Sequence, residues 1–168
     1  MVKQDKVRVA LIGIGSWSSV IANAVQRSNR LELATCYTRT PEKRAAFSRK
    51  YGCDQEKSFE DVLKRTDVDG VLLTTPNAVH AEHAISAAQQ GKHVYVEKPC
   101  CHNIREGRLM IEAARRTQRV MQVGSQTRST RVFIEAIQML HEGVIGEVLT
   151  AKAWNSQKRP NIGHSQPS

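Results

Sequence analysis

Residues 7–18 have the sequence VRVALIGIGSWS, in which an apolar run ends in a glycine turn. The run from Val7 to Ile12 is short and rich in β-branched residues, which is typical of a strand buried on both faces of a parallel sheet. After the turn, apolar residues recur at the spacing of an amphipathic helix, namely Trp17, Val20, Ile21, Ala24 and Val25. A strand, a tight turn and a helix are therefore predicted to follow one another directly.

The same alternation continues along the chain. Further strands are predicted at 31–37, 71–73, 94–96 and 120–123, with helices between them. Neighbouring parallel strands need a helical crossover, so five strands alternating with helices predict an α/β fold with a doubly wound parallel sheet of the Rossmann type. Ligands of such sheets bind beyond the carboxyl ends of the strands.

The organisation changes after Gln126. One more helical stripe runs from Phe133 to Leu140, and the alternation in Val148 to Trp154 predicts an edge strand. A lone helix and a lone strand cannot bury a core of their own. We therefore expect a nucleotide-binding domain over 1–126, and over 127–168 only the truncated start of a second α/β domain.

Composition limits the class of protein. The chain is 40% hydrophobic and 24% charged, which is ordinary for a globular protein. Its first apolar run is too short for a signal peptide or a membrane span, so we expect a cytoplasmic protein with no membrane partner. The net charge of +9 is spread over the chain without basic runs interleaved with aromatic residues. Small anionic ligands, or an acidic partner domain, explain this charge as well as nucleic acid would, and no nucleic-acid partner is expected.

Metal-binding patterns are weak. The four cysteines form no C-x-x-C pair, so they are expected to be reduced thiols. The pair His80-x-x-His83 has no third ligand nearby and is expected to lie on a helix face. No metal site is predicted.

The glycine turn is the first candidate binding element. It consists of Gly13, Ile14, Gly15, Ser16 and Trp17, where bare backbone would let a pyrophosphate reach the helix N-terminal amides. Ser18 stands where a third glycine is usual and is small enough to keep the helix close to the strand. The alternative is a plain tight turn.

The end of the second predicted strand favours NADP over NAD as the cofactor. NAD-binding proteins carry an acidic residue there, whereas this chain has Thr38 and Arg39. No carboxylate repels a 2′-phosphate, and Arg39 and Lys43 could pair with one. The alternative is that both cations are simply solvated.

Two later strand ends also carry polar groups. Thr75, Pro76 and Asn77 follow the third strand, and Glu97-Lys98-Pro99 follows the fourth. A charged pair at the exit of a buried strand is costly unless it serves the binding edge.

Taken together, four motifs resemble the Gfo/Idh/MocA oxidoreductases in order and spacing. They are Gly13-x-Gly15, Thr75-Pro76-Asn77-x-x-His80, Gly91-Lys92-His93-Val94-x-x-Glu97-Lys98-Pro99 and Val123-Gly124. The resemblance implies an NAD(P)-dependent enzyme that moves a hydride between nicotinamide and a sugar, polyol or inositol-like hydroxyl carbon.

The resemblance also implies roles for individual residues. Lys98 would be catalytic, beside the nicotinamide and the reacting carbon, where its ammonium could polarise the substrate hydroxyl. The cofactor's ribose and nicotinamide would be lined by Thr75, Pro76, Asn77 and His80, with Glu97 and Gln126 in support. Gln126 departs from the family pattern, which has asparagine there.

Family members carry a second domain that holds the substrate, builds a homo-oligomer and supplies an Asp or His acid/base. This chain alone is therefore expected to bind cofactor but to turn over little. A non-catalytic dinucleotide-binding module is the alternative. Methyl transfer from S-adenosylmethionine is disfavoured by Glu97-Lys98-Pro99.

Overall fold

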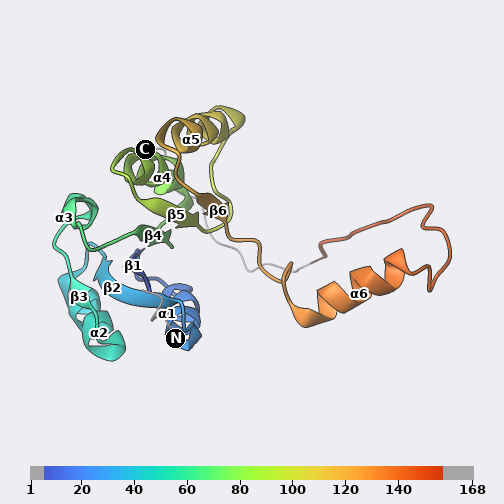
Figure 1. The fold of residues 1–168 in the computed structure, drawn as a ribbon, viewed down its shortest axis with the longest axis horizontal. Helices are drawn as coiled ribbons and strands as arrows, with labels where there is room; N and C mark the ends of the chain where they lie inside the picture. Colours follow the sequence, from blue (N-terminus) through green and yellow to red (C-terminus); the bar gives the residue numbers. More distant parts are fainter. Residues whose placement is uncertain (1–5, 157–168) are drawn as a thin grey trace, which may run out of the picture. The chain divides into compact units, whose positions relative to one another are not determined.

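The computed structural model describes residues 6–156, and its first unit is built on a six-stranded sheet in which every neighbouring pair is parallel (Figure 1). In spatial order the strands are β3 (Asp54–Gln55), β2 (Leu31–Tyr37), β1 (Val7–Ile12), β4 (Gly70–Leu73), β5 (His93–Val96) and β6 (Met121–Val123). The strand ends are in register, since Ile12 lies opposite both Tyr37 and Leu73, and Val96 lies opposite Leu73 and Val123. The order reverses between β1 and β4, which is where such sheets bind ligands.

Helices cover both faces of the sheet. α1 (Ser18–Arg27) and α2 (Pro41–Tyr51) pack on one face, where their side chains join Val9 and Leu11 in one hydrophobic cluster. α3 (Phe59–Lys64), α4 (His80–Gln89) and α5 (Ile104–Thr117) join Ala10 and Ile12 in a second cluster. Alternate residues of β1 thus point to opposite layers, which explains why the strand from Val9 to Ile12 is apolar.

The helix ends explain where the elements begin and stop. Ser58 caps α3 by accepting a bond from the N–H of Asp61, and Asn103 caps α5 in the same way through Glu106. α2 begins at Pro41 and ends at Gly52, whose left-handed backbone stops the helix. α1 is different: it has no side-chain cap and no acidic residue in its first turn.

The predicted fold class is confirmed, with two corrections to individual elements. The strand β3 was not predicted, because it is only two polar, exposed residues that pair with Thr35 and Cys36 of β2. The predicted edge strand at Val148 to Trp154 is wrong, since residues 148–156 form neither helix nor strand. Alternating side chains do not make a strand unless a neighbouring strand accepts its backbone hydrogen bonds.

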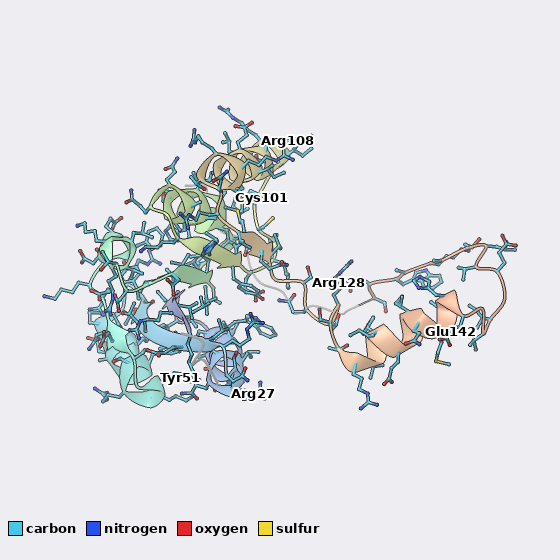
Figure 2. All side chains as sticks on the ribbon, viewed as in Figure 1. Arg27, Tyr51, Cys101, Arg108, Arg128 and Glu142 are labelled. Atoms are coloured by element: carbon cyan, nitrogen blue, oxygen red, sulfur yellow. The ribbon has the colours of Figure 1, made fainter. Side chains whose placement is uncertain are left out.

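The chain divides into two compact units, residues 1–125 and residues 126–168. In the described part of the second unit, α6 (Arg131–His141) is followed by a turn and an extended segment. Side chains stand out all around α6 in Figure 2, and its apolar ones are exposed. Residues 157–168 of the predicted second domain lie outside the described residues, and the predicted domain boundary stays a prediction. No helix among the described residues combines the length and apolarity that a membrane crossing requires.

Candidate functional site

The predicted site residues of the first unit follow strands that end at one edge of the sheet. Because β1, β2, β4 and β5 are parallel and in register, their carboxyl ends bring together the glycine turn, Thr38-Arg39, Thr74 to Asn77, and Glu97-Lys98. We call this edge the carboxyl edge. Neighbouring parallel strands are about 5 Å apart, so these segments lie within reach of a single elongated ligand.

Gly13 is required by the protein's own backbone. Its φ is +91°, and a Cβ there would lie 2.8 Å from the carbonyl of Thr74 and the Cα of Thr75. The turn is also held on both sides, since the N–H of Gly13 bonds the carbonyl of Tyr37 and the N–H of Thr74 bonds the carbonyl of Ile12, each at 2.8 Å. Only glycine lets the loop after β4 come this close.

Gly15 is different, because nothing lies within 4 Å of the position that its Cβ would occupy. Ser18, which is buried, donates from its hydroxyl to the carbonyl of Gly15 at 2.6 Å and so closes the turn. α1 then begins without a side-chain cap, so its positive dipole end lies directly after the turn. Open space at Gly15 and an uncapped helix start fit a pyrophosphate group.

The end of β2 presents positive charge. Arg39 and Lys43 are exposed, and among residues 6–156 neither takes part in an ion pair. Arg44 was not singled out from the sequence, yet its guanidinium donates to the carbonyl of Thr38 at 3.1 Å and thereby holds the loop that carries Arg39. The exposed cations Arg39 and Lys43 at the end of β2 therefore fit an anionic phosphate.

The loop after β4 is fastened to the glycine turn and to the loop after β5. The hydroxyl of Thr74 donates to the carbonyl of Gly13 at 2.5 Å. His80 is only 1% exposed, and its two ring nitrogens lie 2.7 Å from the carbonyl oxygen of Thr75 and 2.8 Å from that of Pro99. The structure thus places His80 beneath the edge. Among residues 6–156, the hydroxyl of Thr75 is buried without a hydrogen-bond partner.

Glu97 and Lys98 lie in different environments. Glu97 is buried, and its Oε1 accepts hydrogen bonds from the indole Nε1 of Trp17 at 2.9 Å and from the hydroxyl of Tyr95 at 3.0 Å. Burial, together with the hydrogen bond to Glu97, raises the pKa of Tyr95 to about 12. Lys98 is exposed at the edge, where its ammonium is accessible to a ligand.

Other predicted positions lie elsewhere. Gln126 begins the second unit, where its carbonyl accepts a bond from the N–H of Arg128 at 2.7 Å. The ring of His83 stacks on Phe59, with 4.4 Å between centroids. Among the described residues, no three His, Cys, Asp or Glu side chains are grouped as a metal site would require.

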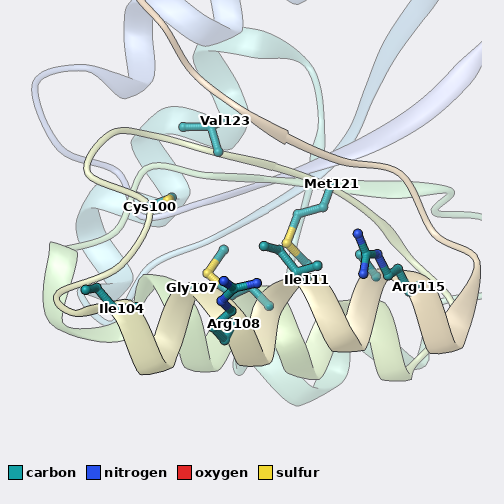
Figure 3. Close-up of a pocket in the computed structure, with 10 residues that line it drawn as sticks. Cys100, Ile104, Gly107, Arg108, Ile111, Arg115, Met121 and Val123 are labelled. Atoms are coloured by element: carbon teal, nitrogen blue, oxygen red, sulfur yellow. The ribbon is translucent and has the colours of Figure 1, made fainter.

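A separate apolar cavity of about 540 Å³ lies between α5 and β6 (Figure 3). It is lined by Cys100, Ile104, Gly107, Arg108, Met110, Ile111, Ala114, Arg115, Met121 and Val123. None of the glycine-turn residues reaches it, and only Cys100 comes from the loop that carries Lys98. A dinucleotide lies across the open edge of a doubly wound sheet, so we place the candidate site at the carboxyl edge and not in this cavity.

Comparison with known proteins identifies the family. The model of the oxidoreductase family with an NAD-binding Rossmann fold, named for Gfo, Idh and MocA, matches residues 7–125. The chain belongs to this family. The match covers the whole sheet and every loop of the carboxyl edge in the first unit.

Three similar proteins of the Gfo/Idh/MocA family illustrate its range. The 4-carboxy-2-hydroxymuconate-6-semialdehyde dehydrogenase of Sphingobium is 29% identical over 90% of this chain. A 3-ketoreductase from Actinomadura kijaniata, solved with TDP-benzene and NADP, is 26% identical over 85% of the chain with a TM-score of 0.81. The WlbA dehydrogenase of Chromobacterium violaceum, solved with NADH and UDP-GlcNAcA, is 28% identical over 84% with a TM-score of 0.78. This chain spans 47%, 46% and 41% of their respective lengths.

Proposed function

We propose that this chain binds NADP(H) or NAD(H) across the carboxyl edge, and that the whole protein transfers a hydride between the nicotinamide and a hydroxyl-bearing carbon of a sugar, polyol or inositol. The observation that carries the proposal is the open space at Gly15 beside the uncapped start of α1. It lies at the end of β1, where the strand order reverses. Turns of this kind at this point of the fold hold pyrophosphate.

The residues of the carboxyl edge would hold different parts of the cofactor and the substrate. The backbone from Gly13 to Trp17 would hold the pyrophosphate, and Thr75, Pro76 and Asn77 would line the ribose and nicotinamide side. When bound, the nicotinamide ring accepts or supplies the hydride. Lys98 would hydrogen-bond the substrate oxygen and stabilise the negative charge that develops there, as an exposed ammonium at this edge can do.

The preference for NADP rests on charge. The residues directly after β2 are Thr38, Arg39 and Thr40, with no carboxylate among them, and Arg39 and Lys43 are exposed. A guanidinium can bind a 2′-phosphate through two parallel charge-assisted hydrogen bonds. One related structure holds NADP and another holds NADH, so the proposed choice in this chain depends on these local cations.

The sugar class is supported by UDP-GlcNAcA in the related WlbA dehydrogenase. The semialdehyde dehydrogenase relative is named for a different substrate, so family membership alone does not select the substrate. We place the protein in the cytoplasm, where both cofactors are available.

The decisive experiment is a calorimetric titration of this chain with NADP(H) and NAD(H), repeated with Gly15→Val. We expect the substitution to abolish binding of either cofactor without changing the melting temperature, because the added side chain enters open space that a ligand would fill. Ala24→Val, at an exposed position of α1, is the control and should bind normally. Unchanged affinity in a folded Gly15→Val protein would refute the dinucleotide site.

The same titration tests the cofactor preference. Arg39→Ala should lower the affinity for NADP by about tenfold or more while leaving that for NAD unchanged, because a charge-assisted hydrogen bond contributes about 1.5–3 kcal/mol. A wild-type chain that prefers NAD would contradict the assignment of Arg39.

A further inference from the structure

Glu97 joins two parts of the chain that lie 80 positions apart. Its Oε1 accepts the indole N–H of Trp17, at the end of the glycine turn, and the hydroxyl of Tyr95, two residues back on β5. The carboxylate is only 7% exposed, whereas Trp17 remains 42% exposed. A buried carboxylate therefore orients a partly exposed aromatic ring at the mouth of the proposed cofactor site.

The geometry of this contact makes it directional. An indole has one N–H and no acceptor, so a bond from Nε1 restricts the orientation of the ring. The acceptor is a carboxylate oxygen of a side chain that is only 7% exposed, and a hydrogen bond to a carboxylate in a buried setting is stronger than one between two neutral groups. Tyr95 supplies a second donor to the same oxygen, and burial together with this bond raises its pKa to about 12.

Gly124, which directly follows β6, lies close to the side chains of Tyr95 and Glu97. A Cβ on Gly124 would overlap the hydroxyl of Tyr95 and would lie 3.0 Å from Oε1 of Glu97. Gly124 therefore leaves room for the Trp17–Glu97–Tyr95 contact. The start of α1 and the ends of β5 and β6 thus meet at one carboxylate.

We propose that Glu97 is a positioning residue, which holds the indole of Trp17 as an aromatic wall of the cofactor site and so sets the spacing between the glycine turn and Lys98. This inference rests on the proposed function. The exposed part of the indole offers an apolar face that the planar nicotinamide half of the cofactor can cover. Glu97 acts through Trp17, while Lys98, the next residue, faces the substrate.

The tether itself can be tested without any cofactor. In a Trp154→Phe background, Trp17 is the one remaining tryptophan, so NMR hydrogen exchange of its indole N–H can be followed alone. We expect slow exchange in this background, fast exchange after Glu97→Ala, and slow exchange after Glu97→Gln, which retains an acceptor oxygen. Tyr95→Phe, which removes only the other donor to Oε1, should keep the proton protected. Equally fast exchange with and without Glu97 would overturn the tether.

A double-mutant cycle in NADPH affinity tests the positioning role. Glu97→Ala and Trp17→Phe should each weaken binding by about tenfold, which is the scale of one charge-assisted hydrogen bond. Combined, they should weaken it no more than Glu97→Ala does alone, because Glu97→Ala has already removed the contact with Trp17. Glu97→Gln should restore most of the affinity. Glu112→Gln, an exposed carboxylate on α5, is the control and should change nothing.

The outcomes separate the two proposals. If the wild-type chain binds NADPH and the two substitutions are additive, or have no effect, the positioning role is overturned while the proposed function stands. If the wild-type chain binds neither NADP(H) nor NAD(H), both fall, whatever the indole exchange shows. Melting temperatures of all variants, with binding measured well below the lowest, exclude loss of affinity through unfolding.

Discussion

The two edges of the sheet differ in whether their charged side chains form ion pairs. At the amino edge, where β1, β2 and β4 begin, Arg8 pairs with Glu32 and Asp67. Arg65 pairs with Asp67 and also with Asp54 and Glu56 of the β3 segment, which lies beside Thr35 and Cys36 of β2. At the carboxyl edge, Arg39, Lys43 and Lys98 are exposed, and within residues 6–156 none of these cations is part of an ion pair.

This difference separates stability from function. Charges that neutralise one another within the fold contribute to its stability and leave little potential for a ligand. Cations left without carboxylates keep their field for an anion that arrives from solution. The same contrast appears in the two lysines of the Gly91 to Pro99 motif: Lys92 is buried and donates to the carbonyls of Arg65 and Val68, at 2.5 and 2.9 Å, whereas Lys98 is exposed.

The largest expected effect is that of Lys98→Met on catalysis. In the whole protein we expect turnover to fall by roughly two to four orders of magnitude, the scale of a group that stabilises charge in the transition state. Cofactor affinity should change only severalfold, because the contact is made mainly in the transition state. Steady-state kinetics and melting temperature, measured on one preparation, check this.

Lys92→Met is the matched control for that prediction. It removes the same charge from the same motif, but we expect it to lower the melting temperature, since two buried carbonyls lose their donor. Cofactor affinity of the folded protein should be kept. If Lys98→Met lowered stability and kept turnover, Lys98 would belong with the structural charges of the amino edge.

The next largest effect compares the two glycines of the turn. Gly13→Ala should cost about 2–4 kcal/mol of unfolding free energy, because it combines a φ of +91° with a backbone clash at 2.8 Å. Gly15→Ala should leave stability almost unchanged, since its Cβ meets nothing within 4 Å. Urea denaturation of both variants checks the difference, and equal losses would mean that the turn relaxes as a unit.

The sequence alone was sufficient to predict the strands and helices that build the layers of the fold. Buried strands carry apolar runs, such as Val9 to Ile12 in β1 and Val71 to Leu73 in β4, and each run is followed within a few residues by a glycine, a proline or a charged pair. These signals are local, so they can be recognised without tertiary information. The two polar residues of β3 carry no such signal. The segment Val148 to Trp154 has the alternating pattern of a strand but does not form one among the described residues.

The residues of the candidate site could be predicted from the sequence, but the contacts between them could not. The sequence places Trp17 at the end of the glycine turn, His80 at the start of a helix and Glu97 at the end of a strand, and all three are assigned to the cofactor. The structure shows that Glu97 bonds Trp17 and that His80 bridges the carbonyls of Thr75 and Pro99. Such contacts join residues far apart in sequence and depend on how neighbouring strand ends meet, so no local pattern contains them.

The smallest expected effect probes the paired charges of the amino edge through pH. Arg65, whose Nη2 lies 2.7 Å from Oδ2 of Asp67, holds the pKa of that carboxyl well below its ordinary value of 3.8, and Arg8 adds a weaker contact at 3.0 Å. A carboxyl whose pKa is lower in the folded than in the unfolded state stabilises the fold fully above about pH 3.8, and this contribution is lost as the pH falls through the folded value.

Asp67→Asn should therefore lower the unfolding free energy by about 1 kcal/mol at pH 7, because the side chain is 43% exposed and surface pairs contribute little. The difference from wild type should shrink steadily below pH 4, where Asp67 of the unfolded chain becomes protonated and the folded carboxylate gains a proton in turn. Chemical denaturation at pH 7, 5, 4 and 3 measures this difference, with Glu112→Gln as an exposed control.

Cofactor affinity should be unchanged throughout the range in which the chain is folded, since Asp67 precedes β4 and lies at the opposite edge from Gly15 and Lys98. Stability curves that run parallel from pH 7 to pH 3 would mean that Asp67 is not ionically paired in solution, and a loss of cofactor affinity would mean that the two edges are not independent.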